Sequence, residues 1–75
     1  MKTLTARVVR DDGQLGAVVG ASSYRGAELV HDGCDAIASQ LAAMAAGGRR
    51  TEREAYDLLA GEPWSNGKIW IGATE

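Results

Sequence analysis

The feature that most constrains the fold is a stripe of apolar residues in the middle of the chain. Its members are spaced four, three, four and three residues apart, and they are Val30, Cys34, Ile37, Leu41 and Met44. This spacing places all five on one side of an α-helix, and the six alanines within residues 36–46 favour the same conformation. The glycine pair Gly47-Gly48 is a typical helix stop. The pattern predicts a long helix over residues 27–46.

The chain before this helix alternates between apolar and polar residues, with the period of two that is typical of strands. Residues 3–10 and 15–22 both show this alternation, and Asp11-Asp12-Gly13-Gln14 lies between them. Asp, Asn and Gly are the residues that tight turns favour. The segment therefore predicts a β-hairpin of residues 3–10 and 15–22.

A second, shorter helix is predicted after the long one. Thr51-Glu52-Arg53-Glu54 fits a capping box, in which the threonine hydroxyl and the second glutamate each satisfy a backbone amide. The helix is expected to run to about Ala60 and to stop at Gly61, because Pro63 cannot continue it. Its buried residues are expected to be Ala55, Leu58 and Leu59.

The last predicted strand covers residues 68–74, where the alternation returns. It follows Asn66-Gly67, a sequence that strongly favours a tight turn. Within it, Ile69 and Ile71 occupy one face and Trp70 the other.

These elements follow in the order ββααβ, which predicts an α+β fold in which a small antiparallel sheet is packed on one face by a long helix and a short helix. We expect a single domain over residues 1–75. Ile37 and Leu41 should form the centre of its core, against strand residues that we expect to be Leu4, Val8, Val19, Ile69 and Ile71. A core of this size, with one cysteine and so no internal disulfide, rarely supplies more than about 3–5 kcal/mol. Self-association or a partner would stabilise it further.

The candidate partner-binding residues lie mostly on the predicted long helix, on the side opposite the apolar stripe. They are spaced four, three and four residues apart, and they are Glu28, Asp32, Asp35 and Ser39. Residues 26–48 contain no Lys or Arg, so no neighbour on the helix neutralises the three carboxylates. Such a face often serves only to solvate a helix. The alternative is that this acidic ridge binds a basic surface of a protein partner.

Trp70 is the remaining candidate partner-binding residue. On the open face of the sheet it could simply pair across strands with Arg7 or Val9. It could instead anchor an interface, because Trp, Tyr and Arg dominate binding hot spots.

Catalytic and metal-binding readings receive little support from the sequence. Ser22 and Ser23 precede the chain's one histidine, His31, but Ser-His chemistry depends on a geometry that no spacing reveals. Structural zinc requires four ligands with paired Cys or His spacing, whereas Cys34 belongs to the apolar stripe. We therefore expect no enzyme activity, no metal and no cofactor.

Charge and composition favour a protein partner over nucleic acid or a membrane. The net charge is −2 and the pI is about 5.3, whereas nucleic-acid-binding domains are usually basic. No apolar run is long enough to span a bilayer, and the first residues lack the apolar region of a secretory signal. We expect a cytoplasmic protein without membrane or direct nucleic-acid binding.

The whole-chain pattern resembles one functional group, the small phage-encoded anti-CRISPR proteins. The resemblance lies in the architecture, a single small domain with a short antiparallel sheet, one or two helices and an acidic face, here Glu28, Asp32 and Asp35. It implies a non-enzymatic inhibitor that acts in the host cytoplasm and binds a basic, nucleic-acid-binding surface of a Cas protein or complex. Two alternatives stay open. One is a homo-oligomeric structural or regulatory protein that associates, as a homodimer for example, through Ala38, Ala42 and Ala45. The other is a weak nucleic-acid-binding module that uses Arg7, Arg10 and Trp70 on the sheet.

Overall fold

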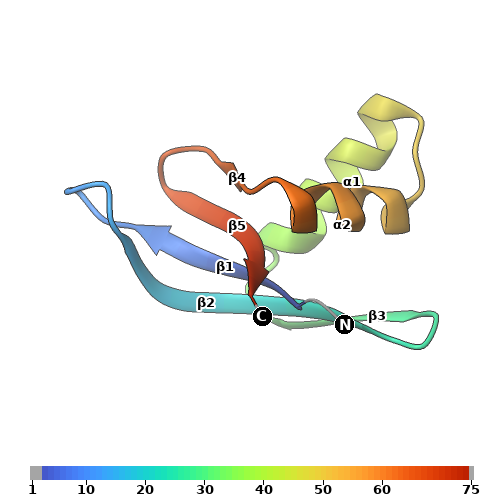
Figure 1. The fold of residues 1–75 in the computed structure, drawn as a ribbon, viewed down its shortest axis with the longest axis horizontal. Coiled ribbons are helices and arrows are strands. Elements are labelled where there is room, and N and C mark those ends of the chain that lie inside the picture. The colour runs from blue at the N-terminus through green and yellow to red at the C-terminus, as the bar shows by residue number, and fades with distance from the viewer. Residues whose placement is uncertain (1–2, 75) are drawn as a thin grey trace.

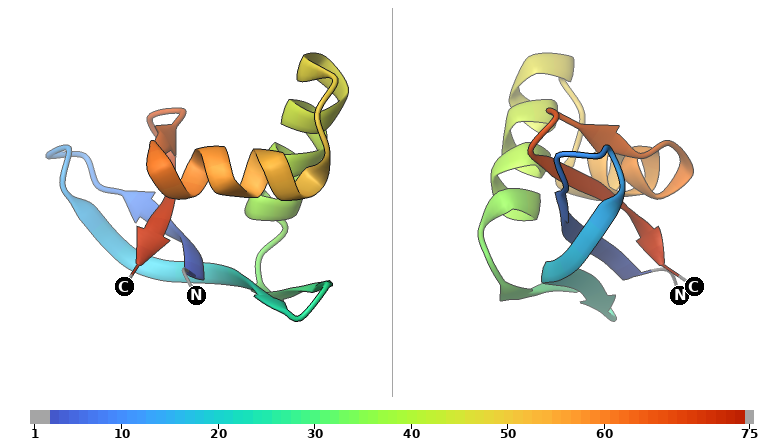
Figure 2. Two further views of the ribbon diagram at one scale, coloured as in Figure 1. Left: turned by 45° about the vertical axis from the view of Figure 1, so that its right-hand side comes forward. Right: turned by 90° about the vertical axis from the view of Figure 1, so that its left-hand side faces the viewer.

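The computed structural model describes residues 3–74, so Met1, Lys2 and Glu75 of the predicted domain lie outside the described residues. Along this range the elements are β1 (Thr3–Val9), β2 (Leu15–Arg25), β3 (Glu28–Gly33), α1 (Ala36–Gly48), α2 (Glu52–Gly61), β4 (Trp64–Ser65) and β5 (Ile69–Thr74). The strands form one antiparallel sheet in the order β3-β2-β1-β5-β4. Both helices lie on one face of it (Figure 1, Figure 2). The predicted α+β fold is confirmed, with β3 and β4 as strands additional to the ββααβ order.

The predicted hairpin of residues 3–10 and 15–22 is confirmed, and its second strand continues to Arg25. Leu4 pairs with Ser22, and the register then shifts twice, between Ala6 and Arg7 and between Arg7 and Val9. Bulges of this kind bend a strand and increase its twist. β2 accordingly curves along its length, and the tip of the hairpin extends beyond the area that the helices cover (Figure 1).

The predicted helix over residues 27–46 is wrong in its first part, because Glu28–Gly33 is strand β3 and the helix begins at Ala36. Arg25 pairs directly with Glu28, so only two residues connect β2 to β3. Gly26 occupies the first of these positions with φ +64°, which suits a two-residue hairpin loop. Pairing with β2 satisfies the backbone hydrogen-bonding groups of Glu28–Gly33. The helical spacing of Val30 and Cys34 could not reveal that this segment pairs as a strand.

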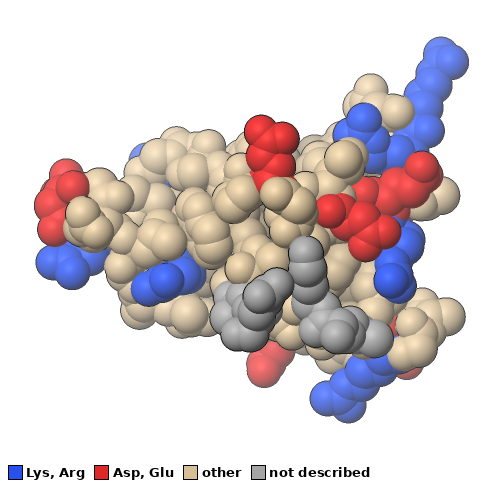
Figure 3. Space-filling model, viewed as in Figure 1, with Lys and Arg blue, Asp and Glu red and all other residues tan. Residues whose placement is uncertain are grey.

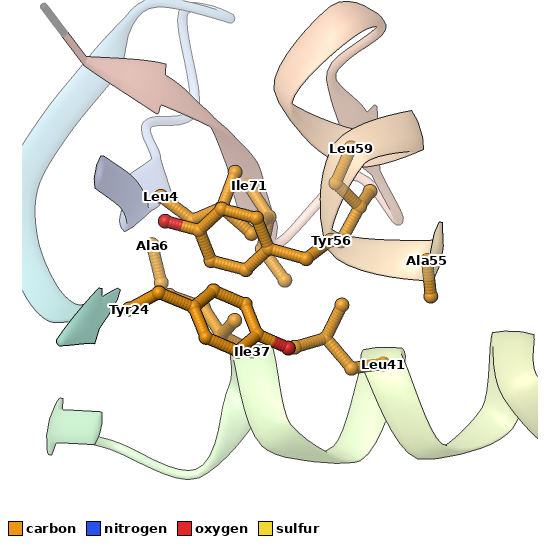
Figure 4. Close-up of a cluster of buried hydrophobic side chains, with 9 residues drawn as sticks. All are labelled: Leu4, Ala6, Tyr24, Ile37, Leu41, Ala55, Tyr56, Leu59 and Ile71. Carbon is orange, nitrogen blue, oxygen red and sulfur yellow. The ribbon is translucent and has the colours of Figure 1, made fainter. Parts of the chain in front are cut away.

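The core forms where the two helices meet the centre of the sheet. Ile37 and Leu41 of α1 are buried against Leu4 and Ile71, as predicted (Figure 4). Ile69 packs at the margin of this cluster. The prediction is wrong for Val8 and Val19, which are exposed. Val19 has no partner on β1, because it lies at the register shift between the pairs Ala6–Gly20 and Arg7–Val18.

Helix α2 begins with the predicted capping box. The Thr51 amide donates to Glu54 Oε1 at 2.9 Å, and the Glu54 amide donates to Thr51 Oγ1 at 3.1 Å. The hydrogen bond from the Thr51 amide holds the pKa of the Glu54 carboxyl below its usual value. The turn at Asn66-Gly67 is also present, since Asn66 Oδ1 accepts hydrogen bonds from the amides of Lys68 and Ile69.

The buried face of α2 differs from the prediction at one position. Ala55 and Leu59 are buried, but the third buried residue is Tyr56 and not Leu58. The Tyr56 ring meets the Tyr24 ring edge-on, with 4.9 Å between the ring centroids (Figure 4). The Tyr56 hydroxyl donates to the Ser22 carbonyl at 3.1 Å. Burial raises the pKa of both tyrosines. Leu58 points away from the core and is 49% exposed.

Within the described residues, α1 and α2 are each too short or too polar to cross a membrane.

Candidate functional site

The structure separates the residues of the predicted acidic ridge. The prediction that they share a single helix face is therefore wrong. Glu28 and Asp32 lie on strand β3, whereas Asp35 is the N-cap residue of α1 and Ser39 lies on the exposed side of that helix. The Asp35 side chain makes no capping hydrogen bond. The helical spacing that linked the four residues does not exist, because the helix begins only after Asp35.

Glu28 and Asp32 nevertheless share a surface, the open face of the sheet. Leu4, in the core beneath the helices, pairs with Ser22, which pairs in turn with His31. Side chains alternate between the two faces along a strand. The neighbouring residue Asp32 therefore projects to the face without helices, and Glu28, four residues earlier, does the same.

Trp70 lies on this open face too, as predicted, and it pairs across strands with Arg7. Its indole folds over Gly72, where an added Cβ would come within 2.5 Å of two ring carbons. Arg7 is itself held in place, because its Nε donates to the Gly16 carbonyl at 3.0 Å. The cross-strand pairing is thus confirmed, and one side of the half-buried indole remains toward solvent.

A row of paired residues connects the Asp32 carboxylate to the Trp70 indole. Asp32 pairs with Ala21, Ala21 with Thr5, and Thr5 with Gly72, the residue that Trp70 covers. Three strand spacings, about 14 Å, separate the two ends of the row. Small side chains therefore lie between a carboxylate on one side and an aromatic ring on the other. The sequence did not reveal this role of Thr5 and Ala21, because the β3 pairing was not apparent.

The carboxylates of this face have basic neighbours, because Arg25 pairs directly with Glu28 and Arg7 lies on the same face. Among residues 3–74, the ion pairs join Arg10 to Asp12 and Arg53 to Asp57, both at 3.6 Å, and neither Glu28 nor Asp32 takes part in one. In the view of Figure 3 basic and acidic side chains lie next to one another at the two ends of the molecule, and further acidic groups lie near its middle. A partner thus meets local groups of charge rather than one continuous patch of a single sign.

The structure joins Ser22 and His31, with 2.5 Å between Ser22 Oγ and His31 Nδ1. Ser22 is only 2% exposed, so its hydroxyl is closed to a substrate. Asp32, the next residue along the chain, projects from the opposite face of the sheet. The pair therefore links β2 to β3, and its geometry does not provide an accessible nucleophile. No group of three His, Cys, Asp or Glu residues in the described part of the chain could hold a metal ion.

A second surface feature lies on the helix side. A groove of about 390 Å³ opens between α1, α2 and β4, and apolar side chains such as Met44, Leu58 and Trp64 line it. Trp64 also packs against the core. This groove was not predicted, because Leu58 was expected in the core.

Comparison with protein families, with curated proteins and with solved structures finds no match to this chain.

Proposed function

We propose that this chain is a non-enzymatic protein-binding inhibitor that uses the open face of its sheet. The observation that carries the proposal is the placement of Glu28, Asp32 and Trp70 on that one face. The carboxylates attract a basic partner, and the exposed side of the indole offers an apolar or cation–π contact to the same partner. Asp35 and Ser39 lie elsewhere and have no part in it.

The partner class that fits this chemistry is a protein with a basic surface. A partner arginine or lysine can pair with Asp32 while a second one stacks on Trp70, about 14 Å away across the sheet. Surfaces that bind nucleic acid carry several basic groups, because they neutralise phosphates with Lys and Arg. Together with the architectural resemblance to anti-CRISPR proteins, this favours the nucleic-acid-binding surface of a Cas protein or complex in the host cytoplasm.

Reversing one carboxylate tests the proposal. Asp32→Lys is expected to weaken binding to a purified Cas effector complex by about 2–5 kcal/mol if the contact is buried, because it places like charges together. Trp70→Ala should weaken it as well. Isothermal titration calorimetry measures both effects, and thermal melts establish that each variant is folded.

The matched control is Asp11→Lys, which makes the same charge change at an exposed position in the loop between β1 and β2. This variant should bind nearly as well as the wild type. If Asp11→Lys and Asp32→Lys weaken binding equally, the effect comes from net charge and the open face is not the binding surface.

The nucleic-acid-binding alternative rests on the pairing of Arg7 with Trp70 on the same face. Arg7 is engaged by the Gly16 carbonyl and Arg10 by Asp12, and the net charge is −2. We therefore expect no appreciable DNA or RNA binding at physiological salt in a gel-shift assay. A micromolar shift that is lost in Arg7→Ala and Arg10→Ala would favour the nucleic-acid-binding module instead.

A further inference from the structure

The two edges of the sheet differ in what they offer to another strand. Within residues 3–74 the edge strands are β3 and β4. β4 is only two residues long and follows Pro63, and short strands and prolines both limit pairing at an edge. β3 has six residues, pairs with β2 without a register shift and has four exposed residues. β3 is therefore the edge that an added strand could use (Figure 1).

The backbone of β3 turns alternately toward β2 and away from it. Glu28 is the fourth residue of a tight turn, so its amide faces the strand before the turn. At the other end, the Cys34 amide donates to the Val19 carbonyl of β2 at 3.1 Å. Because alternate residues of an antiparallel strand face the same neighbour, the backbone groups of Leu29 and His31 point away from β2. Such groups along an edge are a template for pairing with another chain.

The side chains of β3 indicate the charge of the strand that would pair there. Glu28, Val30 and Asp32 alternate along the open face of the sheet. On the β2 side Asp32 pairs with Ala21, which is uncharged, and Glu28 pairs with Arg25. A residue of an added strand would lie directly opposite each of the three on the other side. Opposite charges in such pairs stabilise a sheet and like charges destabilise it, so basic residues are favoured opposite both carboxylates.

The same carboxylates make a second copy of the chain a poor occupant of this edge. A two-fold pairing of two β3 strands centred on Val30 would set Glu28 opposite Asp32 of the copy. β3 contains neither lysine nor proline, the residues that most often block an edge. Its acidic side chains thus disfavour another acidic strand and favour a basic one.

We propose that an extended segment of the basic partner adds to β3 as a further strand of the sheet. It pairs with the backbone of Leu29 and His31, and it places basic side chains opposite Glu28 and Asp32 and an apolar one opposite Val30. The segment therefore has basic, apolar and basic residues at alternate positions. Main-chain hydrogen bonds provide the affinity in this mode of recognition, and the alternate side chains provide the specificity. The inference rests on the proposed function, to which it adds the way the partner binds.

A synthetic peptide tests the strand addition directly. The probe has lysine, valine and lysine at alternate positions and threonine, which favours strands, between them. Amide hydrogen exchange followed by NMR should slow at Leu29 and His31 when the peptide is added, because their amides become hydrogen-bonded. The amide of Asp32 already faces β2 and should change little. Unchanged exchange at both Leu29 and His31 under saturating peptide would overturn the proposal.

A charge exchange tests the specificity. A peptide with glutamate in place of both lysines should bind the wild type about tenfold more weakly. Asp32→Lys should weaken binding of the lysine peptide and strengthen binding of the glutamate peptide. If Asp32→Lys changes the affinity for neither peptide, the edge does not read charge and the proposed partner segment is wrong.

A matched pair of variants isolates the backbone contribution. His31→Pro and His31→Ala both remove the contact with Ser22, but only proline removes the outward N–H. His31→Pro should bind the lysine peptide about fivefold more weakly than His31→Ala, through the loss of one hydrogen bond. Thermal melts establish that both variants fold. If His31→Pro does not fold, a lysine peptide with N-methylated backbone amides replaces it, and equal affinity of the methylated and unmethylated peptides contradicts the strand addition.

Binding to a purified Cas effector complex separates this inference from the proposed function. If His31→Pro and His31→Ala bind the complex equally while Asp32→Lys binds it weakly, the open face is the binding surface and the strand addition is wrong. If the wild type binds the lysine peptide through β3 but does not bind the complex, the strand addition holds and the proposed target is wrong. A wild type that sediments as a dimer, with exchange at Leu29 and His31 already slow without peptide, would show that a second copy occupies the edge and would overturn the proposal.

Discussion

Replacing Leu41 with alanine is expected to leave the isolated chain largely unfolded. Leu41 is fully buried in the centre of α1, where it contacts the core beneath the helices (Figure 4). Truncating a buried leucine to alanine costs about 2–5 kcal/mol, and a domain of this size rarely holds more than about 3–5 kcal/mol in total. The loss is therefore comparable to the whole free energy of unfolding.

The measurement is a thermal melt followed by circular dichroism, with Asp35→Ala as the control. Asp35 is exposed and its side chain makes no capping hydrogen bond, so its removal should change the melting temperature little. If the two variants lower the melting temperature equally, α1 does not pack through Leu41. Self-association would partly rescue Leu41→Ala at high protein concentration, so the melts are run at low concentration.

The parts of the fold that the sequence predicted are those with local causes. The capping box needs only Thr51 and Glu54, and the turn at Asn66-Gly67 needs only the Asn66 side chain and the glycine that follows it. The first hairpin follows from alternation on both sides of a turn sequence. In each case neighbouring residues supply the hydrogen-bonding partners, so the pattern alone was sufficient.

The parts that the sequence did not predict depend on distant residues. Glu28–Gly33 forms a strand because β2 continues far enough to pair with it, and Val30 and Cys34 fit a helical spacing without being helical. Tyr56 turns its own side of α2 to the core, where its hydroxyl reaches the carbonyl of Ser22, 34 residues away, and Leu58 on the other side is exposed. Neither the pairing of β3 with β2 nor the contact of Tyr56 with Ser22 is visible in a local sequence pattern.

The candidate site was predicted in part, because the repeats of a helix and of a strand agree at a spacing of four residues. Residues four apart share a face of a helix and also share a face of a strand. Glu28 and Asp32 therefore stay together although the predicted helix is a strand. Asp35 is separated from them because Gly33 ends the strand between the two aspartates. Trp70 was placed correctly because its strand follows a local turn.

The junction after β3 carries the second large expected effect, since Gly33→Ala should destabilise the fold by more than about 2 kcal/mol. Gly33 has φ +96°, where a residue with a side chain is strained by about 1–3 kcal/mol. An added Cβ would also lie 2.5 Å from the Val19 carbonyl oxygen and 2.8 Å from Gly20 Cα. Both are backbone atoms of β2, so the two strands would have to separate. Urea unfolding monitored by tryptophan fluorescence measures the loss.

Gly26→Ala separates backbone strain from this steric clash. Gly26 also has a positive φ, +64°, but an added Cβ there meets nothing within 4 Å. Its replacement should therefore cost only about 1 kcal/mol. The difference between the two variants measures how closely β3 approaches β2. If both cost the same, Gly33 does not approach the backbone of β2 as closely as the structure places it.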